Sequence, residues 1–212
     1  FRRSGMLGTN PASSSPMRWI FGLCLLLALT PSLLHGGTIV LDAGHGGHDP
    51  GGIPGQKFSE KSAALDITRR IQSRLQAAGH RVILTRSSDV FVELSERVAI
   101  SNRAPSRAVF VSIHLNSDPK RTGHGIETYH SNQRGSALAQ AIHRRVVKAS
   151  GGPDRGVRRA RFYVLRYNKK PSVLVELGFL THASEGAKIA RSEAYRQKLA
   201  DAVAEGIRAC VR

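Results

Sequence analysis

The sequence predicts an α/β fold, a three-layer sandwich in which a mostly parallel central sheet has helices on both faces. Short, nearly continuous apolar runs at 38–41, 108–113 and 172–175 have the composition of strands that are buried on both sides. Longer segments between them, such as 60–78, carry apolar residues at helical spacing. Strands that alternate with helices build a parallel sheet covered on both faces.

The remaining elements follow from the same patterns. The helix at 60–78 is followed by Gly79, which suits a helix end because glycine accepts positive φ angles. A glycine pair and a proline likewise end the helix that begins at Ser136. We expect strands at 38–41, 81–85, 108–113, 126–129, 162–165 and 172–175. We expect helices at 60–78, 94–102, 136–150 and 193–210.

Residues 1–36 differ in composition from the rest of the chain. Met17 and Arg18 precede an apolar run at 19–29, which is short for a membrane span and typical of a secretory signal peptide. We therefore expect residues 1–36 to be an N-terminal extension with a cleaved signal, and 37–212 to be one catalytic domain. An uncleaved membrane anchor is the alternative. The signal interpretation places the protein outside the cytoplasm, in the periplasm or at the extracellular cell wall.

The chain is strongly basic, with a formal net charge of +17. Such a charge attracts polyanions in general. No helix-turn-helix, RNP or zinc-finger pattern accompanies it, and aromatic residues make up only 6% of the chain, so we expect no nucleic-acid partner. Anionic wall or outer-membrane polymers suit an exported protein better, and a solvated basic surface without a particular partner is an equal alternative. We expect a monomer.

Ionisable side chains follow three of the expected strands. After the first strand, residues 42–52 hold five glycines and two histidines, so the strand ends there and His45 lies at its carboxyl end. Open α/β sheets bind their ligands at such strand ends. Two other strands end in His114 and Glu176, and Glu60 opens a helix fifteen residues after His45. Four such groups at one edge of the sheet predict a functional site.

These residue types suit one zinc ion. Hydrolytic zinc sites take three ligands of the His, His and Glu kind and leave a fourth position to a water, whose pKa falls to roughly 7. His45, His114 and one glutamate complete this set, and the other glutamate is a general base. We assign Glu60 as the ligand, because the start of a helix holds it beside the glycine-rich loop, and Glu176 as the base. Asp42 either orients a metal-bound histidine or caps the turn.

The same residues lie in four collinear motifs, which are VLDAGHGG at 40–47, EK at 60–61, SIHLN at 112–116 and VELGFL at 175–180. They closely resemble the zinc-dependent N-acetylmuramoyl-L-alanine amidases of the type 3 family, and the resemblance covers about residues 38–209.

The resemblance implies hydrolysis of the amide between the lactyl group of muramic acid and the L-alanine of the peptidoglycan stem peptide. It also implies zinc ligands at His45, Glu60 and His114 and a catalytic Glu176. The chain departs from the family pattern at His182, where the family commonly has asparagine. We expect this change to alter the rim of the groove and not the metal.

Two other functions remain open from the sequence. A zinc peptidase of related geometry would cut a peptide bond in cell-wall peptides, and a non-catalytic wall-binding domain would share the fold. Some relatives occlude their zinc with a helix inserted between the second histidine and the catalytic glutamate. Only 62 residues separate His114 from Glu176 here, and the expected elements use most of them, so we expect activity without a separate activator.

The signal-peptide interpretation gives a first prediction. The exported protein should begin between Ser32 and Thr38, because the apolar run ends shortly before the first expected strand. N-terminal sequencing of the exported protein measures this start. A mature chain that still contains residues 19–29 would show a membrane anchor instead.

Overall fold

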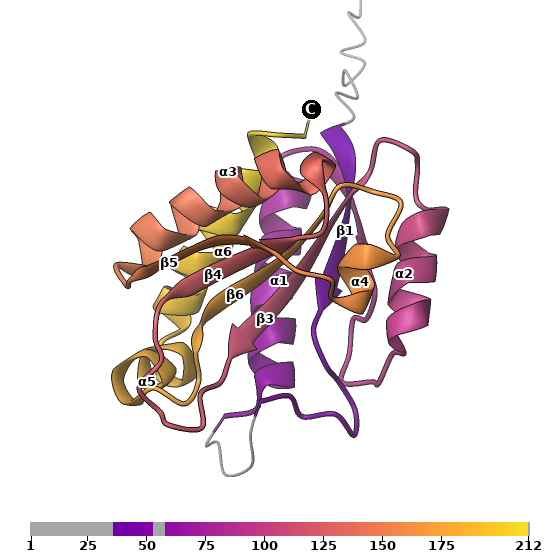
Figure 1. Ribbon diagram of the computed structural model, residues 1–212. Coiled ribbons are helices and arrows are strands. Elements are labelled where there is room, and N and C mark those ends of the chain that lie inside the picture. The colour runs from indigo at the N-terminus through magenta and orange to yellow at the C-terminus, as the bar shows by residue number, and fades with distance from the viewer. Residues whose placement is uncertain (1–35, 53–57, 212) are drawn as a thin grey trace, which may run out of the picture. The chain divides into compact units, whose positions relative to one another are not determined.

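The computed structural model describes residues 36–52 and 58–211, so the expected signal segment and its cleavage region before residue 36 lie outside the described residues. The described part is built around one six-stranded sheet (Figure 1). Its strands are β1 (Gly36–Ala43), β2 (His80–Leu84), β3 (Val109–Asn116), β4 (Ile126–His130), β5 (Asp154–Arg159) and β6 (Ser172–Phe179). Its helices are α1 (Glu60–Ala77), α2 (Leu94–Arg103), α3 (Gln133–Ser150), α4 (Tyr163–Arg166), α5 (Ala183–Arg191) and α6 (Glu193–Arg208).

The sheet is mostly parallel. Its strand order is β2-β1-β3-β6-β4-β5, and β1, β2, β3 and β6 all run in one direction. β4 pairs antiparallel with β6, and the edge strand β5 is parallel to β4. The predicted α/β class, with a mostly parallel sheet between helical layers, is therefore confirmed.

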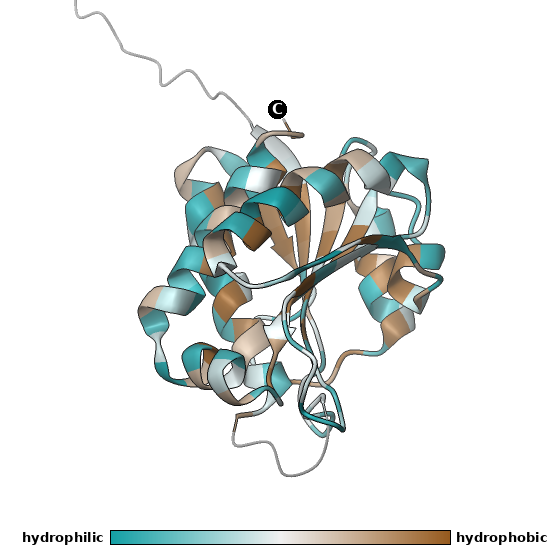
Figure 2. Cartoon of the chain, turned by 60° about the vertical axis from the view of Figure 1, so that its left-hand side comes forward, coloured by the Kyte–Doolittle hydropathy of each residue, from teal (hydrophilic) through white to brown (hydrophobic). Residues whose placement is uncertain are grey.

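The two faces of the sheet are covered unequally. Successive strand residues point to opposite faces, so Ile39 and Leu41 of β1 join the large core under α1, α3 and α6. Val40 points the other way and packs with Phe110 and Leu174 under the small layer of α2 and α4. Figure 2 shows the apolar strands enclosed between helices whose outward sides are hydrophilic. None of the helices in the described residues is long and apolar enough to cross a membrane.

Three elements differ from the sequence expectation. Residues 162–165 were expected as a strand because aromatic and β-branched residues favour strands, but this expectation was wrong. The segment forms α4, and its Val164 and Leu165 are buried as one face of a helical turn. β5 was missed because an edge strand of sequence DRGVRR lacks apolar alternation, and α5 was missed because it is only nine residues long.

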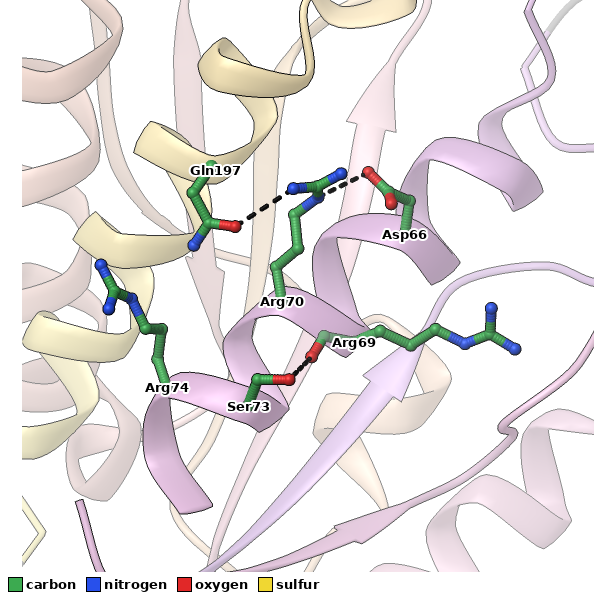
Figure 3. Close-up of a pocket in the computed structure, with 6 residues that line it drawn as sticks. All are labelled: Asp66, Arg69, Arg70, Ser73, Arg74 and Gln197. Carbon is green, nitrogen blue, oxygen red and sulfur yellow. Dashed lines mark hydrogen bonds and ion pairs between the residues drawn. The ribbon is translucent and has the colours of Figure 1, made fainter. Parts of the chain in front are cut away.

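Polar contacts on the solvent side join α1 to α6. In Figure 3, Arg70 of α1 donates from Nη1 to the Gln197 side chain of α6 at 3.1 Å and from Nε to Asp66 of its own helix at 2.9 Å. Arg74 donates to both carboxylate oxygens of Asp201, at 2.6 and 2.9 Å. Exposed ion pairs of this kind each contribute about 0–1 kcal/mol, so the apolar packing beneath them carries most of the stability.

The contact between α3 and α6 gives a second prediction. A Cβ atom at Gly206 would lie 2.5 Å from the Cα of Ile142, so the backbones of the two helices approach each other closely there. Gly206→Ala would gain about 1 kcal/mol of helix propensity but would overpack this contact at a cost of about 1–3 kcal/mol. We expect a net loss of about 1 kcal/mol in the free energy of unfolding, measured by urea denaturation.

The neighbouring Glu205 is exposed on the same helix and supplies the control. Glu205→Ala should change the stability by less than about 0.5 kcal/mol. A Gly206→Ala variant that is more stable than the wild type would contradict the close approach of the two helices.

Candidate metal centre

The structure brings the four predicted site residues together on the α2/α4 side of the sheet. His114 of β3 and Glu176 of β6 are direct neighbours in the strand register, so their side chains point to the same face. The loop after β1 carries His45 to them, and α1 begins at Glu60. All four residues line one cavity of about 830 Å³.

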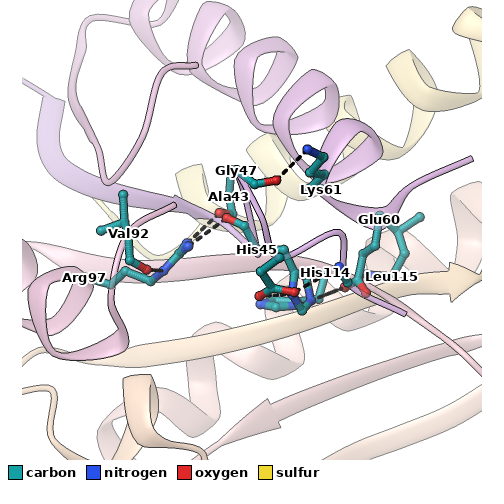
Figure 4. Close-up of polar contacts among 12 residues, drawn as sticks. Ala43, His45, Gly47, Glu60, Lys61, Val92, Arg97, His114 and Leu115 are labelled. Atoms are coloured by element: carbon teal, nitrogen blue, oxygen red, sulfur yellow. Dashed lines mark hydrogen bonds and ion pairs between the residues drawn. The ribbon is translucent and has the colours of Figure 1, made fainter. Parts of the chain in front are cut away.

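Glu60 lies at the centre of the cluster (Figure 4). Its Oε1 lies 3.1 Å from Nε2 of His45 and 2.9 Å from Nδ1 of His114. The same oxygen accepts the backbone N–H of Leu115 at 3.0 Å. One ligand atom from each of the three side chains lies within 4.8 Å of the others, which is a set that could hold a metal ion.

A tight loop fixes the His45 ring. Its backbone has φ 58°, in the left-handed region. Its Nδ1 lies 2.8 Å from Oδ2 of Asp49, and an Nδ1–H donor to this carboxylate leaves Nε2 directed at Glu60. Gly51 passes close behind, where a Cβ would lie 2.6 Å from Cδ2 of His45 and 2.7 Å from Oε2 of Glu60. The glycine therefore allows the loop and the helix start to approach each other.

Two buried arginines hold the loop that carries His45. Arg97 of α2 donates to the carbonyl oxygen of His45 at 2.7 Å and to the carboxylate of Asp42 at 2.8 Å. Asp42 also accepts the hydroxyls of Thr85 and Ser112, each at 2.6 Å. The expectation that Asp42 orients a metal-bound histidine directly is therefore wrong, because its hydrogen bonds go to Arg97 and two hydroxyls.

The second arginine joins the loop to α1. Arg86 donates to the carbonyl oxygens of Ala43 and Gly44 at 2.9 and 2.7 Å, and to that of Lys61 at 2.9 Å. Lys61 in turn donates from Nζ to the carbonyl oxygen of Gly47 at 2.7 Å. Because Lys61 follows Glu60 directly, these bonds fix the glutamate relative to the histidine loop.

The cluster keeps its carboxylate charged. Burial alone would raise the pKa of Glu60, but hydrogen bonds from His114 and His45 lower it to about 2. Burial alone would lower the pKa of His45, but Glu60 and Asp49 raise it to about 9. The Glu60 carboxylate and the two imidazole nitrogens beside it also form a donor set that attracts a divalent cation.

Glu176 has the opposite electrostatic character. Burial raises the pKa of this carboxyl group to about 7, and the neighbouring Glu60 and Glu127 carboxylates add to the rise. Its Oε2 is buried without a hydrogen-bond partner in the described residues. Glu127, its register neighbour on β4, instead accepts from Asn116 at 2.9 Å, Tyr129 at 2.8 Å and Arg155 at 2.8 Å. Glu176 is therefore the carboxyl group that remains free for a reactant.

The donor set fits a zinc ion. Two imidazoles and one carboxylate converge, the second nitrogen of His45 is held by a carboxylate, and a buried acidic oxygen without a partner lies on the adjacent strand. This is the arrangement of a metal-dependent hydrolase on an α/β sheet.

The comparisons with known proteins agree with this class. The sequence profile of the N-acetylmuramoyl-L-alanine amidase family matches residues 39–209, and the chain belongs to this family. It is 41% identical over 177 residues to the N-acetylmuramoyl-L-alanine amidase LytC of Bacillus subtilis, covering 81% of this chain but only 35% of LytC.

Solved structures of the family share the fold. The catalytic domain of the amidase CwlV of Bacillus (Paenibacillus) polymyxa var. colistinus superposes with a TM-score of 0.74 at 36% identity, covering 81% of this chain and 96% of that domain. The amidase AmiC2 of Nostoc punctiforme gives a TM-score of 0.73 at 40% identity, covering 80% of this chain and 94% of that one.

The sequence interpretation missed several residues that complete the site. Asp49 lies four residues after His45 in the same loop, and this spacing was the available signal. Arg86 directly follows the expected strand at 81–85 and Arg97 lies in the expected helix at 94–102, but only the fold shows that they bind loop carbonyls. His182, the departure from the family pattern, caps α5 by accepting from the backbone N–H of Glu185 at 3.4 Å.

The buried Arg97–Asp42 pair gives a third prediction. Both side chains are nearly inaccessible, with 2% and 1% exposure, so Asp42→Asn would leave a buried guanidinium without its counter-charge. Breaking such a pair costs about 3–5 kcal/mol. Urea denaturation at neutral pH should show a loss of this size. Ser112→Ala is the matched control, because it removes one hydroxyl hydrogen bond to the same carboxylate but leaves the ion pair, and it should cost about 1.5–3 kcal/mol.

The same pair sets a pH dependence. Burial alone would raise the pKa of Asp42, but Arg97 and the two hydroxyls hold it below its usual range. A lowered pKa in the folded state means that the stabilisation is complete above about pH 4, where the unfolded chain is also ionised, and is lost as the pH falls further. Asp42→Asn should lack this acid-side loss. An identical acid dependence in the variant would contradict the assignment.

Proposed function

We propose that this chain is a zinc-dependent amidase that hydrolyses the bond between N-acetylmuramic acid and the L-alanine of the peptidoglycan stem peptide. The observation that carries the proposal is the convergence of His45, Glu60 and His114 next to the unpartnered carboxyl group of Glu176. Membership in the N-acetylmuramoyl-L-alanine amidase family supports the substrate class. Because the match covers only about a third of LytC, we propose this substrate for the domain described here, and we propose nothing about the rest of LytC for this chain.

The metal would be held by Nε2 of His45, Nδ1 of His114 and Oε1 of Glu60, the atoms that already face one another. A zinc ion held there would lower the pKa of a water to near neutral and would polarise the scissile carbonyl as a Lewis acid. Asp49 fixes the ring of His45 through Nδ1, and the backbone N–H of Leu115 fixes Oε1 of Glu60. These contacts keep two of the three proposed ligands, His45 and Glu60, oriented without rearrangement.

Glu176 is the general base of the proposal. Its free Oε2 accepts the proton of the attacking water and then delivers it to the leaving nitrogen of L-alanine. A carboxyl group whose pKa is raised to about 7 by burial holds a proton more readily than an exposed one, which suits the second transfer. A cation held by the three ligands would favour the ionised form of Glu176, which is needed for the first transfer, in which Glu176 accepts the proton of the water.

The segment between His114 and Glu176 supports activity without an activator. Its long helix, α3, packs in the large core together with α6, on the face of the sheet opposite to the cluster (Figure 1). Its other elements are β4, β5 and the single turn of α4. We therefore propose that this segment carries no occluding helix.

The cellular setting follows from the substrate. Peptidoglycan lies outside the cytoplasm, so the protein acts after export, in the periplasm or at the cell wall. Without residues 1–36, which hold three arginines and no acidic residue, its formal net charge is +14, and this suits a surface rich in anionic polymers. We propose that it works there as a monomer.

The assignment of the two glutamates gives a fourth prediction. Glu176→Gln is nearly isosteric and leaves the three proposed ligands intact, so zinc should stay bound while hydrolysis falls by about 100-fold or more. His114→Ala and Glu60→Ala each remove a ligand, so zinc content after dialysis should fall together with activity. Metal analysis on the three variants measures the difference.

Mass spectrometry of the released fragments identifies the reaction. Digestion of muropeptides should release free stem peptides that begin with L-alanine. Shorter peptides released from an intact muramoyl peptide would show a zinc peptidase instead. Zinc lost from Glu176→Gln but retained in Glu60→Ala would show that the two glutamates are exchanged.

A further inference from the structure

Large exposed hydrophobic side chains gather in two short segments of the described chain. In the order of the sequence they are Val90, Phe91, Leu94, Phe162, Tyr163 and Tyr167. The first three lie at the start of α2 and the last three around α4, and these two helices pack against each other. About seventy residues separate the segments in sequence, so the fold itself collects this apolar surface.

Four of these side chains line the same cavity as the candidate metal centre, and we call them the apolar wall: Phe91, Leu94, Phe162 and Tyr163. Between 37% and 52% of each one is exposed. Helices α2 and α4 cover only the first half of the strands on this face, where Val40, Phe110 and Leu174 are buried. The apolar wall therefore lies at the edge of the layer formed by α2 and α4, next to the cavity.

The aromatic rings of the wall have fixed neighbours. Phe162 meets the ring of Tyr129 edge-on at 5.1 Å, and Tyr163 packs against Tyr167 at 4.6 Å. Phe91 packs against His48 at 4.1 Å. Each of the three rings thus has an aromatic neighbour, and each residue is still 37–43% exposed. Supported, exposed rings are pre-organised surfaces for a ligand that has an apolar face.

The charge on the two sides of Glu176 differs. On the β4 and β5 side, Arg155 lies 2.8 Å from the Glu127 carboxylate and Arg158 lies 3.9 Å from it, so cations are concentrated there. The side chains of the apolar wall are themselves uncharged, and the exposed charges beside them are of both signs, Glu93 at the cavity and Arg161 and Arg166 around α4. A substrate part that carries carboxylates is attracted to arginines such as those of β5, whereas an uncharged part suits the wall.

We propose that the apolar wall binds the glycan strand of peptidoglycan by stacking of neutral N-acetylated sugar rings on Phe91, Phe162 and Tyr163. This proposal rests on the proposed function, because it assigns the direction of the substrate across the cluster. The sugar side of the scissile amide points to α2 and α4, and the acidic stem peptide points to β4 and β5. A pyranose ring has an apolar face of C–H bonds that suits an aromatic surface, and Glu93 can accept sugar hydroxyls at its edge.

The binding test uses a neutral sugar without a peptide. N-acetylglucosamine tetramer should bind the wild-type protein, as measured by isothermal titration calorimetry. Tyr163→Ala and Leu94→Ala should each weaken this binding by about 5- to 20-fold, the loss expected for one ring or side chain of a stacking surface. Val90→Ala is the matched control, since Val90 is 47% exposed in the same segment as Leu94 but does not line the cavity.

A second measurement uses the reaction. Two substrates with the same stem peptide are compared, one with a single muramoyl sugar and one with a tetrasaccharide. Tyr163→Ala should lower kcat/KM for the tetrasaccharide substrate by about tenfold and lower that for the single sugar by a smaller factor, because the single sugar contacts less of the wall. Unfolding curves of each variant exclude a folding defect.

The outcomes separate the two proposals. Tetramer binding that depends on Tyr163 and Leu94, with neither substrate hydrolysed by wild type, would keep the glycan wall and reject the amidase. Hydrolysis with equal kcat/KM for wild type and Tyr163→Ala on the tetrasaccharide substrate would reject the glycan wall and keep the amidase. Wild-type protein that does not bind the tetramer at millimolar concentration, or an equal loss in Val90→Ala, would also reject the glycan wall.

Discussion

The candidate site depends on the buried contact between Arg97 and the loop that follows β1. The glycine-rich loop has no regular hydrogen-bond ladder of its own, yet it must hold the His45 ring against Glu60. Arg97 supplies the missing donors to its carbonyl oxygens, and Asp42 neutralises the arginine from the strand below. A buried cation is costly unless it is paired and fully hydrogen-bonded, so the pair fixes α2, β1 and the loop in one arrangement.

The unequal coverage of the sheet creates the space for the reaction. The face under α1, α3 and α6 is packed along the whole strands, whereas α2 and α4 cover only one half of the other face. At the uncovered half, the register of β3, β6 and β4 places His114, Glu176 and Glu127 in one row across the sheet. Of these three described residues, Glu176 is the one with a buried oxygen that lacks a hydrogen-bond partner. The short helices α2 and α4, which leave the site open, also supply its apolar wall.

The sequence was sufficient for the fold class and for the prediction that the four candidate site residues lie together. Three of them follow apolar runs that mark buried strands, and Glu60 opens a helix. It was not sufficient for contacts that join distant elements. Asp49, and not Asp42, turned out to hold His45, since only the loop conformation decides which carboxylate reaches Nδ1. Local propensity gives the wrong prediction for the charged edge strand β5 and the helical turn α4. Pairing with β4 sets the conformation of β5, and burial in the core sets that of α4.

In the proposed site, His45, Glu60 and His114 bind one zinc ion while Glu176 faces the reactant. A crystal structure of the zinc-loaded protein, with anomalous diffraction measured on both sides of the zinc absorption edge, tests this arrangement most directly. We expect one anomalous peak about 2.0–2.2 Å from Nε2 of His45, Nδ1 of His114 and an oxygen of Glu60, with Glu176 outside this coordination. A peak coordinated by Glu176 in place of Glu60, or no peak at this cluster, would contradict it.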